Sequence, residues 1–530
     1  MATSSTETAV LVVGAGPVGL MLACELARRD VPVRIVDRLT EPTDQSRAIV
    51  VHARTLEALE RLGVAQAVID AGVRTTGMLL RAGGDVLATI ELSTVESPFP
   101  FSVSLPQTET ERILADRLAS LGVRVERGVA LGALEQDADG ARATLAGPDG
   151  GEEVVSCRYV AGCDGARSTV RASCGDRLAG SFHGEVFALG DVEGEHDLDP
   201  ANIHSFFSER GPLLVFPMRG GRMRVMAQLG ATRDPAGGES PPEQLSAPTL
   251  EDLQRLCEER GDGLQLRLTR AHWLTTFEIH HALVSSYRHG RAFLLGDAAH
   301  IHSPAGGQGM NTGLQDAFNL GWKLAAAWRE TAGEPLLDSF DAERRPVAER
   351  VLSSTTKLTR LGTLETPWAR ALRDRAIRVG AGLAPVQHAL ARQTEETDIA
   401  YRASPVVAGR GLHDGPRPGD AAPDVADIGL RAALLAAPPD AHVALCIAGH
   451  RAAAPVRPTD GAPLWRVAVG AADAAAGFDA VVDDPGGRAA ERYATGRRGG
   501  LLLVRPDGYV GLVAEATDQG AVDRYFAGLR

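Results

Sequence analysis

The fold is decided near the start of the chain, by residues 9–37, AVLVVGAGPVGLMLACELARRDVPVRIVD. The apolar run from Ala9 to Val13 is typical of a buried parallel strand. A glycine-rich turn follows, and residues 20–29 then carry apolar side chains at helical spacing. A second apolar run, residues 31–36, predicts a strand that ends at Asp37. This order predicts a β-α-β unit and therefore an α/β fold.

The turn between these strands carries the pattern G-x-G-x-x-G at Gly14, Gly16 and Gly19, with Pro17 inside it. Glycines there allow a tight turn and the close approach of the backbone to a pyrophosphate, which the N-terminus of the helix attracts. Asp37 follows Gly14 by 23 residues (37 − 14) and can accept hydrogen bonds from a ribose. Because an acid repels a 2′-phosphate, the motif favours FAD or NAD over NADP.

A second junction of strand and helix lies at residues 295–312, LGDAAHIHSPAGGQGMNT. A strand is expected to end at Gly296 and Asp297, and a helix to begin near Gly309. Asp297 can hold the hydroxyl groups of a ribitol chain. The backbone N–H groups of residues 306–311 would stabilise negative charge on a reduced flavin ring.

Composition excludes several classes of protein. The chain has 530 residues and a net charge of −13, which argues against non-specific binding to nucleic acid. No apolar run is long enough to span a membrane, and the first nine residues do not form a secretory signal. The six cysteines are scattered without a C-x-x-C pair, which predicts a cytoplasmic protein with reduced thiols and no metal site.

Four segments are expected from the pattern of elements. Between residues 180 and 290, short strands at 205–207, 213–218 and 223–229 alternate with glycine-rich turns, and a loop is expected over 234–248. The predicted divisions are a nucleotide-binding domain at 1–180, with strands near 75–105 that belong to the next domain; an antiparallel substrate domain at 181–290; completion of the first domain and long helices at 291–403; and a small α/β domain at 404–530, after a linker at 404–423.

Three separated motifs together resemble the group A, single-component FAD-dependent aromatic hydroxylases, over about residues 8–360. They are residues 14–19, residues 163–171 (CDGARSTVR) and residues 296–312. Ser46-Arg47-Ala48 and Gln107 also match, and the resemblance implies that Arg47 and Gln107 contact the pyrophosphate and ribitol of FAD. The candidate cofactor-binding residues are Gly14, Gly16, Pro17, Gly19, Asp37, Arg38, Arg47, Gln107, Asp164, Gly165, Gly296, Asp297, Pro304, Gly307, Gln308, Gly309, Met310 and Asn311.

The resemblance implies that NADPH or NADH reduces the FAD, and that reaction with O₂ gives a flavin C4a-hydroperoxide that hydroxylates an aromatic ring. The expected substrate is a polycyclic aromatic polyketide or another large phenol. The nicotinamide would bind transiently, with Asp164, Arg47 and Arg167 as nearby candidates. The resemblance assigns no metal ion.

The end of the chain supports the same resemblance. Residues 501–510, LLLVRPDGYV, are similar to the terminal strands of the thioredoxin-like domain on the phenol hydroxylase and polyketide hydroxylase branch. Cys446 is the one cysteine beyond the linker, so dithiol chemistry within one chain is excluded. The expected role of this domain is packing or contact between subunits, as in a homodimer.

Candidate substrate contacts follow from residue type alone. His52, Arg54, His280 and His281 can position or deprotonate a phenol, although an ordinary structural role is the more frequent alternative. Six apolar residues are candidates to line the cavity, of which at most two are expected to do so while most are plain core residues: Phe206, Phe207, Phe216, Met218, Met223 and Met226.

Alternatives remain open at this stage. The residues do not distinguish a hydroxylation from a Baeyer–Villiger oxygenation on the same scaffold. A non-enzymatic flavin-binding or interaction protein is an alternative of another class, and the intact glycines of the second glycine-rich loop argue against it. A flavin-dependent halogenase needs a lysine near the substrate, and the two lysines of the chain, Lys323 and Lys357, lie in the helices after the second glycine-rich loop. A disulfide reductase is excluded, because the chain lacks a second G-x-G-x-x-G and a redox C-x-x-C.

Overall fold

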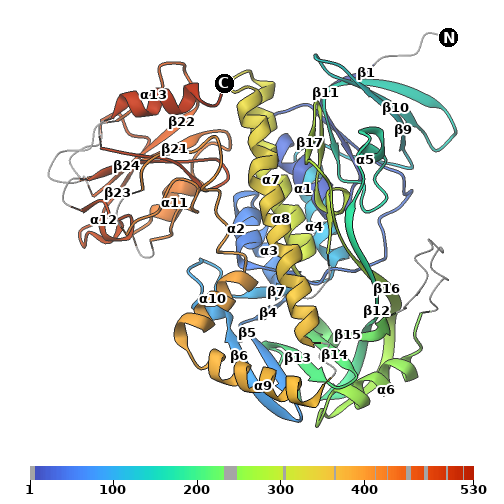
Figure 1. Ribbon diagram of the computed structural model, residues 1–530. Helices are drawn as coiled ribbons and strands as arrows, with labels where there is room; N and C mark the ends of the chain where they lie inside the picture. The colour runs from blue at the N-terminus through green and yellow to red at the C-terminus, as the bar shows by residue number, and fades with distance from the viewer. Residues whose placement is uncertain are drawn as a thin grey trace.

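The computed structural model describes residues 6–231, 247–302, 306–362, 366–411, 414–425, 428–448, 455–470, 476–496, 499–516 and 518–530. Figure 1 shows three bodies: two that share the long helices α7 and α8, and a C-terminal body beside them. None of the helices that the structure describes is both long and apolar enough to cross a bilayer.

The first body is built on a sheet with the order β17-β18-β11-β1-β2-β8, to which the β9–β10 hairpin is added beside β11. β1 pairs in parallel with both β11 and β2, as the continuous apolar run at its end predicts. The strands are β1 (Thr6–Val13), β2 (Val33–Asp37), β8 (Val125–Arg127), β9 (Ala130–Gln136), β10 (Ala141–Ala146), β11 (Glu152–Gly162), β17 (Arg288–His289) and β18 (Ala292–Leu294).

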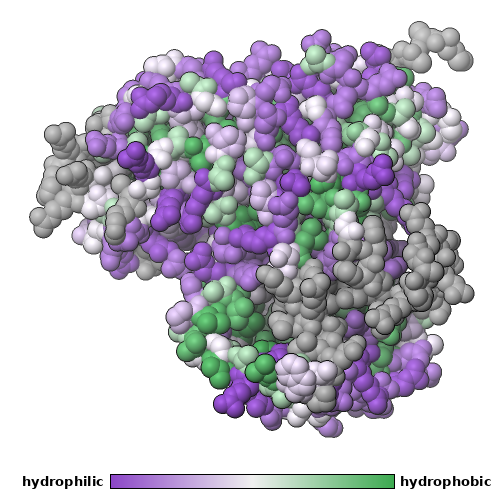
Figure 2. Space-filling model, viewed as in Figure 1, coloured by the Kyte–Doolittle hydropathy of each residue, from purple (hydrophilic) through white to green (hydrophobic). Residues whose placement is uncertain are grey.

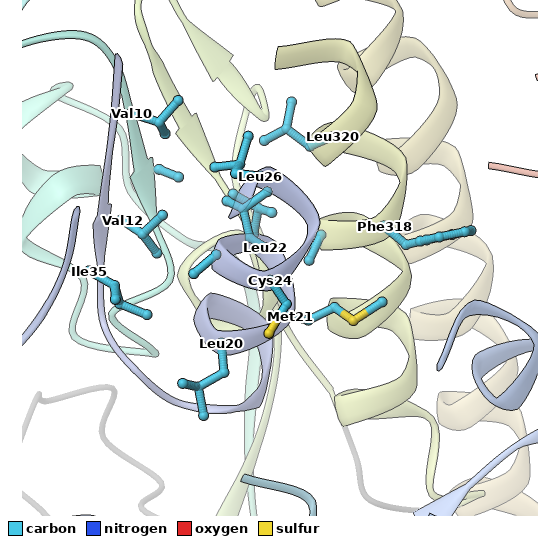
Figure 3. Close-up of a cluster of buried hydrophobic side chains, with 14 of the residues drawn as sticks. Val10, Val12, Leu20, Met21, Leu22, Cys24, Leu26, Ile35, Phe318 and Leu320 are labelled. Atoms are coloured by element: carbon cyan, nitrogen blue, oxygen red, sulfur yellow. The ribbon is translucent and has the colours of Figure 1, made fainter. Parts of the chain in front are cut away.

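Helix α1 is the centre of the first core. Figure 3 shows it between β1 and α7, with Leu22 and Leu26 directed into the packed layer. The helices of this body and the short strands beside it are α1 (Pro17–Ala27), β3 (Val50–Val51), α2 (Ala53–Arg61), α3 (Ala65–Ala71), β4 (Val73–Thr75), η1 (Leu92–Thr94), β7 (Ser102–Ser104), α4 (Gln107–Ser120), α5 (Thr169–Ser173), η3 (Gly296–Ala298), α7 (Gln308–Trp328) and α8 (Glu334–Gly362).

The second body is an eight-stranded sheet with the order β19-β16-β12-β15-β14-β13-β5-β6. Its long strands β12 and β16 pair antiparallel and reach from this body toward the first, as Figure 1 shows. Of the loop expected over 234–248, residues 234–246 lie outside the described residues. The elements are β5 (Gly77–Ala82), β6 (Asp85–Glu91), β12 (Ala179–His196), β13 (Asn202–Ser208), β14 (Gly211–Pro217), η2 (Arg219–Gly221), β15 (Arg222–Ala231), α6 (Leu250–Arg260), β16 (Leu266–Leu283), β19 (His300–Ile301), α9 (Pro367–Ala381) and α10 (Ala384–Thr394).

The two faces of this sheet have different partners, because side chains alternate along each strand. One face packs on α6 through an apolar cluster that includes Leu213, Val225 and Leu253. The other face turns Phe187, Phe216 and their neighbours toward the first body. Helices α9 and α10 cover the β6 edge and expose Trp368, Leu372, Val379, Leu383 and Val386. In Figure 2 apolar surface gathers over the lower part of the molecule, where these helices lie.

The C-terminal body is a sheet with the order β20-β25-β24-β21-β22-β23, in which β21 and β22 are parallel and β24 is antiparallel to both of its neighbours. Its elements are β20 (Ala408–Gly409), α11 (Leu430–Leu435), β21 (His442–Ile447), β22 (Leu464–Val469), β23 (Ala480–Val482), α12 (Arg488–Arg492), β24 (Gly500–Val504), β25 (Val510–Ala514) and α13 (Gln519–Ala527).

This body joins the first through the turn between β24 and β25. Arg505 is fully buried and donates to Glu343 of α8 at 2.6 and 2.9 Å. Asp507 of the same turn accepts from Trp322 and Asn319 of α7. Lys323 completes the cluster with a 2.7 Å bond to Glu343. The turn therefore lies inside the molecule rather than at its surface.

Candidate functional site

The first two sequence motifs meet at the ends of β1 and β11. Gly14 has φ +101°, and a Cβ there would overlap the carbonyl group of Cys163. The Cys163 N–H donates to the Val13 carbonyl at 2.8 Å, and the Gly14 N–H donates to the Val36 carbonyl at 2.8 Å. Because only glycine fits this contact, the first glycine-rich turn is locked against the 163–171 motif.

The third motif joins the same place. A Cβ on Gly296, which has φ +55°, would lie 2.9 Å from the side chain of Val18 at the start of α1. Arg171 of the second motif donates to the Ala298 carbonyl at 2.9 Å. Three stretches far apart in the sequence therefore converge, as the sequence predicts.

The shared space lies in front of two helix N-termini. No protein atom would lie within 4 Å of a Cβ on Gly16, the N-cap of α1, so the motif opens outward there. Neither α1 nor α7 has a side-chain N-cap hydrogen bond among the described residues, which leaves their first N–H groups for a ligand. Each helix dipole favours negative charge at its own N-terminus, and the open one at Gly16 suits an anion such as a pyrophosphate.

Asp297 borders this space. Its side chain is exposed to solvent, yet the protein around it desolvates the carboxyl group and raises its pKa. The charges of His300 and Arg47 oppose this shift in pKa. Arg47 is itself exposed, so a carboxyl group and a guanidinium from distant segments lie near the same opening.

Asp37 is the last residue of β2 and faces the first turn. Its Oδ2 accepts from the Ala15 N–H at 2.6 Å, and its Oδ1 accepts from the Leu39 N–H at 2.8 Å. Arg127 is 3.8 Å away, while Arg38 points into solvent. The carboxylate therefore shapes the glycine-rich turn from the position that the sequence predicts for a ribose contact.

Gln107 begins α4 and is tied to the 46–48 segment. Its Oε1 accepts from the Ala48 N–H at 3.2 Å, and its Nε2 donates to Glu111 at 2.9 Å. Its own N–H donates to the Ser46 hydroxyl at 3.0 Å. Gln107 and Arg47 are thus brought together across about 60 residues of sequence (107 − 47).

Arg224 was not predicted from the sequence, yet it fixes this segment. It is buried on β15, binds Asp191 of β12 at 2.6 and 2.8 Å, and donates to the Ser46 hydroxyl and the Arg47 carbonyl at 3.0 Å. A charged residue inside the largely apolar strand at residues 223–229 was the available signal. The second sheet therefore positions Arg47 directly.

The 306–311 loop offers its main chain rather than its side chains. Gly307 is the N-cap of α7 with φ +67°. Asn311 is fully buried, donates to the carbonyls of Val50 and Gly307 at 2.8 Å, and accepts from the His52 N–H. Gln308 donates to the Gln393 carbonyl, Met310 lies in the core, and Gly309 lies beside His302. Pro304 lies outside the described residues.

Asp164 is occupied locally. Its two carboxylate oxygens accept from the Ser168 hydroxyl at 2.5 Å and from the Thr169 N–H at 2.6 Å, so they cap α5. Gly165 has φ +77° with open space around it, and Arg167 is exposed. The backbone at 163–165 therefore faces the first motif, while the acid supports the turn.

The six apolar candidates divide between the two faces of the second sheet. Phe216, Met218 and Met226 lie on the face toward the first body, in a cluster with Ile49 and Val50. The prediction was wrong for Phe206 and Met223, which pack on the opposite face beside α6. Phe207 lies under the guanidinium of Arg373 from α9, 4.8 Å from the ring centre.

The face toward the first body also carries aromatic residues that were not predicted. Phe187 and Phe277 stack at 5.9 Å, and Trp273 lies beside Arg224. They come from β12 and β16, whose alternation the sequence analysis did not use. The result is an aromatic surface opposite the converging motifs.

The charged candidates lie elsewhere. His52 is buried with both ring nitrogens engaged, and Arg54 pairs with Glu57 and lies over the ring of Tyr509, so neither is placed to deprotonate a phenol. His281 is buried and His280 half-buried near the end of β16.

Lys323 is fully buried in its pair with Glu343, away from the aromatic face, which removes the halogenase interpretation for that lysine. The side chain of Lys357 lies outside the described residues. Within the described part of the chain, no group of three or more metal-ligating residues is found.

Comparisons with known proteins agree with this geometry. The model of the FAD binding domain matches residues 7–355, and that of the phenol hydroxylase C-terminal dimerisation domain matches residues 456–530. The 6-methylpretetramide 4-monooxygenase of Streptomyces rimosus is 38% identical over 413 residues, 76% of this chain and 71% of that protein. A flavin-dependent monooxygenase of Mycobacteroides abscessus is 33% identical and covers 96% of this chain and 97% of its own. The solved structure of the anhydrotetracycline hydroxylase OxyS from Streptomyces rimosus has a TM-score of 0.72 at 30% identity and covers 98% of both chains.

Proposed function

Since the chain belongs to the family of FAD-dependent aromatic monooxygenases, we propose that it uses NADPH or NADH and O₂ to hydroxylate a polycyclic aromatic polyketide or a similarly large phenol. The observation that carries this proposal is the aromatic face of the second sheet, which lies opposite the convergence of the three motifs. An apolar, aromatic face of this kind suits a fused-ring substrate better than a small charged one.

FAD, when bound, supplies the reduction by the nicotinamide and the activation of dioxygen. The residues of the chain would bind and orient the cofactor. We assign the pyrophosphate to the N-terminus of α1 at Gly16, and the ribitol to Asp297. The N–H groups at the start of α7 would face the flavin ring, where they would favour negative charge. The apolar face, including Phe216 and Met226, would exclude water above the ring.

Turnover tests the whole proposal. Purified protein is expected to be yellow, with the absorbance bands of oxidised flavin, and a phenolic polycyclic substrate is expected to stimulate its oxidation of NADPH. A product heavier than the substrate by one oxygen atom and stable to base indicates a phenol. An ester or lactone that opens in base would instead indicate a Baeyer–Villiger reaction. Binding of FAD without consumption of NADPH would contradict an enzymatic role.

Asp297→Ala tests where the cofactor lies. The ribitol would lose a charge-assisted partner, so FAD binding should weaken by about 1.5–3 kcal/mol. Asp116→Ala is the control, because Asp116 is exposed and bonds only Arg112 on the surface of α4 among the described residues. Equal FAD dissociation constants for the two variants would count against this position.

The C-terminal body is proposed to be a thioredoxin-like domain that contacts a second copy of the chain. The parallel pair β21–β22 beside the antiparallel pair β24–β25 supports the first part. The match to a dimerisation domain supports the second. Light scattering of the purified protein distinguishes a dimer from a monomer, and a monomer at all concentrations would contradict the contact.

A further inference from the structure

A buried chain of polar side chains ends on the 306–311 loop. The His52 Nε2 lies 3.0 Å from the Gly306 carbonyl oxygen, and its Nδ1 lies 3.0 Å from the Ser102 hydroxyl. Ser102 in turn lies 2.5 Å from Oε1 of Glu395, in the segment after α10. All three side chains are buried, with exposures of 1% or less. The chain therefore connects an interior carboxyl group to the loop that opens α7.

The partners decide which atoms carry protons. A carbonyl oxygen can only accept, so the Nε2 of His52 carries a hydrogen. Oε2 of Glu395 accepts from the Ala53 N–H at 2.6 Å, at the positive end of α2, and both features favour the ionised carboxylate. Ser102 then donates to Glu395 and accepts from Nδ1 of His52. Both ring nitrogens are donors, so His52 is an imidazolium.

The electrostatics agree with this assignment. Burial alone would lower the pKa of His52, but the interaction with Glu395, whose Oε1 lies 3.9 Å from Nδ1, and the charge of Glu396 outweigh it, so the net shift is upward. Glu396 faces His52, Arg344 of α8 and Gln315 of α7, and burial raises its pKa to about 7. Of this acidic pair, Glu395 is the member linked to His52 through Ser102.

The loop itself needs such a support. Asn311 fixes the C-terminal end of the loop through its hydrogen bonds to the His52 N–H and to the carbonyls of Val50 and Gly307. The carbonyl of Gly306 is at the N-terminal end of the loop. Its orientation sets the orientation of the peptide bond to Gly307, the left-handed N-cap of α7. A charged donor on that carbonyl holds the following N–H groups toward the space in front of α7.

We propose that His52 is the positioning residue of the 306–311 loop: as an imidazolium held by Glu395 through Ser102, it fixes the Gly306 carbonyl and so orients the N–H groups that receive the flavin. This inference rests on the proposed flavin site and adds a residue to it. The positive charge of His52 makes its hydrogen bond to the Gly306 carbonyl stronger than a bond from a neutral donor.

Two substitutions of His52 separate the two ends of the ring. In His52→Gln the amide nitrogen reaches the position of Nε2 and can still donate to Gly306, whereas in His52→Asn it replaces Nδ1 and keeps only the contact with Ser102. The dissociation constant of FAD is measured on apoprotein by fluorescence quenching. We expect His52→Asn to bind FAD at least about ten-fold more weakly than wild type, and His52→Gln to stay within about three-fold.

The charge is tested by Glu395→Gln and Ser102→Ala. In Glu395→Gln the linked carboxylate is gone, so burial lowers the pKa of His52, whereas in Ser102→Ala Glu395 remains 3.9 Å from Nδ1. FAD affinity of Glu395→Gln should then decline between about pH 6 and pH 8, where ordinary histidines titrate, and by no more than about three-fold, because the neutral ring keeps its Nε2 hydrogen on Gly306. Ser102→Ala should decline at a pH between that of Glu395→Gln and that of wild type. A merely structural role would alter the affinity equally at all pH values.

The outcomes are separable. Thermal unfolding of each apoprotein shows whether a variant folds, and Ser102→Ala removes the link with the smallest change in volume. Equal FAD affinities of His52→Asn and His52→Gln, or pH profiles identical to wild type for both charge variants, would overturn the positioning role alone. Wild-type apoprotein that binds no FAD would overturn the proposed function and, with it, this inference.

Discussion

Gly16 and Gly19 belong to one motif, yet a methyl group would meet different surroundings at each. At Gly19 it would overlap the carbonyl oxygen of Gly14, whereas at Gly16 it would project into open space. Gly19→Ala should therefore destabilise the apoprotein by at least about 1–3 kcal/mol. Gly16→Ala should leave its unfolding within about 0.5 kcal/mol, but weaken FAD binding at least about ten-fold. Calorimetry and FAD titration check the pair, and unchanged FAD affinity in Gly16→Ala would place the pyrophosphate elsewhere.

Glu396 makes the free energy of unfolding depend on pH, and a single substitution separates this effect from those of other groups. Burial raises its pKa from 4.5 to about 7, so its contribution is complete below pH 4.5 and is lost as the pH rises through 7. Glu396→Gln keeps a neutral amide beside Gln315. The variant should match wild type near pH 4.5 and exceed it by about 2–3 kcal/mol at pH 8. Urea unfolding at the two values measures this, and a constant difference would mean that Glu396 does not titrate in the fold.

At the scale of elements, strand alternation separates substrate contacts from core. Phe277 of β16 lies on the aromatic face with Phe187, and Met223 of β15 lies on the α6 face. Phe277→Ala should raise the KM for a fused-ring substrate and increase the hydrogen peroxide released per NADPH oxidised. Met223→Ala should instead cost about 2–5 kcal/mol of stability and leave the KM unchanged. Steady-state kinetics with peroxide detection check both, and an altered KM in Met223→Ala would contradict the assignment of faces.

The elements also show what the sequence could predict. The β1–α1–β2 unit, α4, α7 and most short strands follow from apolar periodicity and glycine turns, which are local signals. The sequence does not show which face of β14 or β15 packs toward the first body. Alternation defines two faces, and only tertiary packing distinguishes them. Arg224 and Glu395 were missed for a related reason: each acts on a segment more than 170 residues away (224 − 46 and 395 − 53), with no shared local motif.

At the scale of the whole molecule, buried charges connect the three bodies. Arg344 of α8 binds Asp316 of α7 at 2.7 Å, and Asp316 accepts from the Gly296 N–H at 3.2 Å, next to Asp297. Arg344 also donates to the Tyr401 hydroxyl, over which the guanidinium of Arg505 lies. The C-terminal body therefore supports the helices that support the candidate flavin site. Removing the C-terminal body should therefore destabilise the rest of the protein more than removing an ordinary appended domain would.

Arg505→Met tests this connection. The guanidinium is fully buried between Glu343 and Asp507, and its loss leaves two buried carboxylates with fewer donors. Glu343 then keeps Lys323, Asn319 and Ser404 as donors, and Asp507 keeps Asn319 and Trp322. Breaking such a network typically costs about 3–5 kcal/mol. Arg505→Lys should rescue little, since one ammonium cannot bond both carboxylates in the geometry of the fork. Arg524→Met, at an exposed arginine of α13, is the control and should unfold like wild type. Because the same network reaches Asp316, Arg505→Met should release FAD during heating before the protein unfolds. If flavin release coincides with unfolding in both variants, the C-terminal body does not support the flavin site.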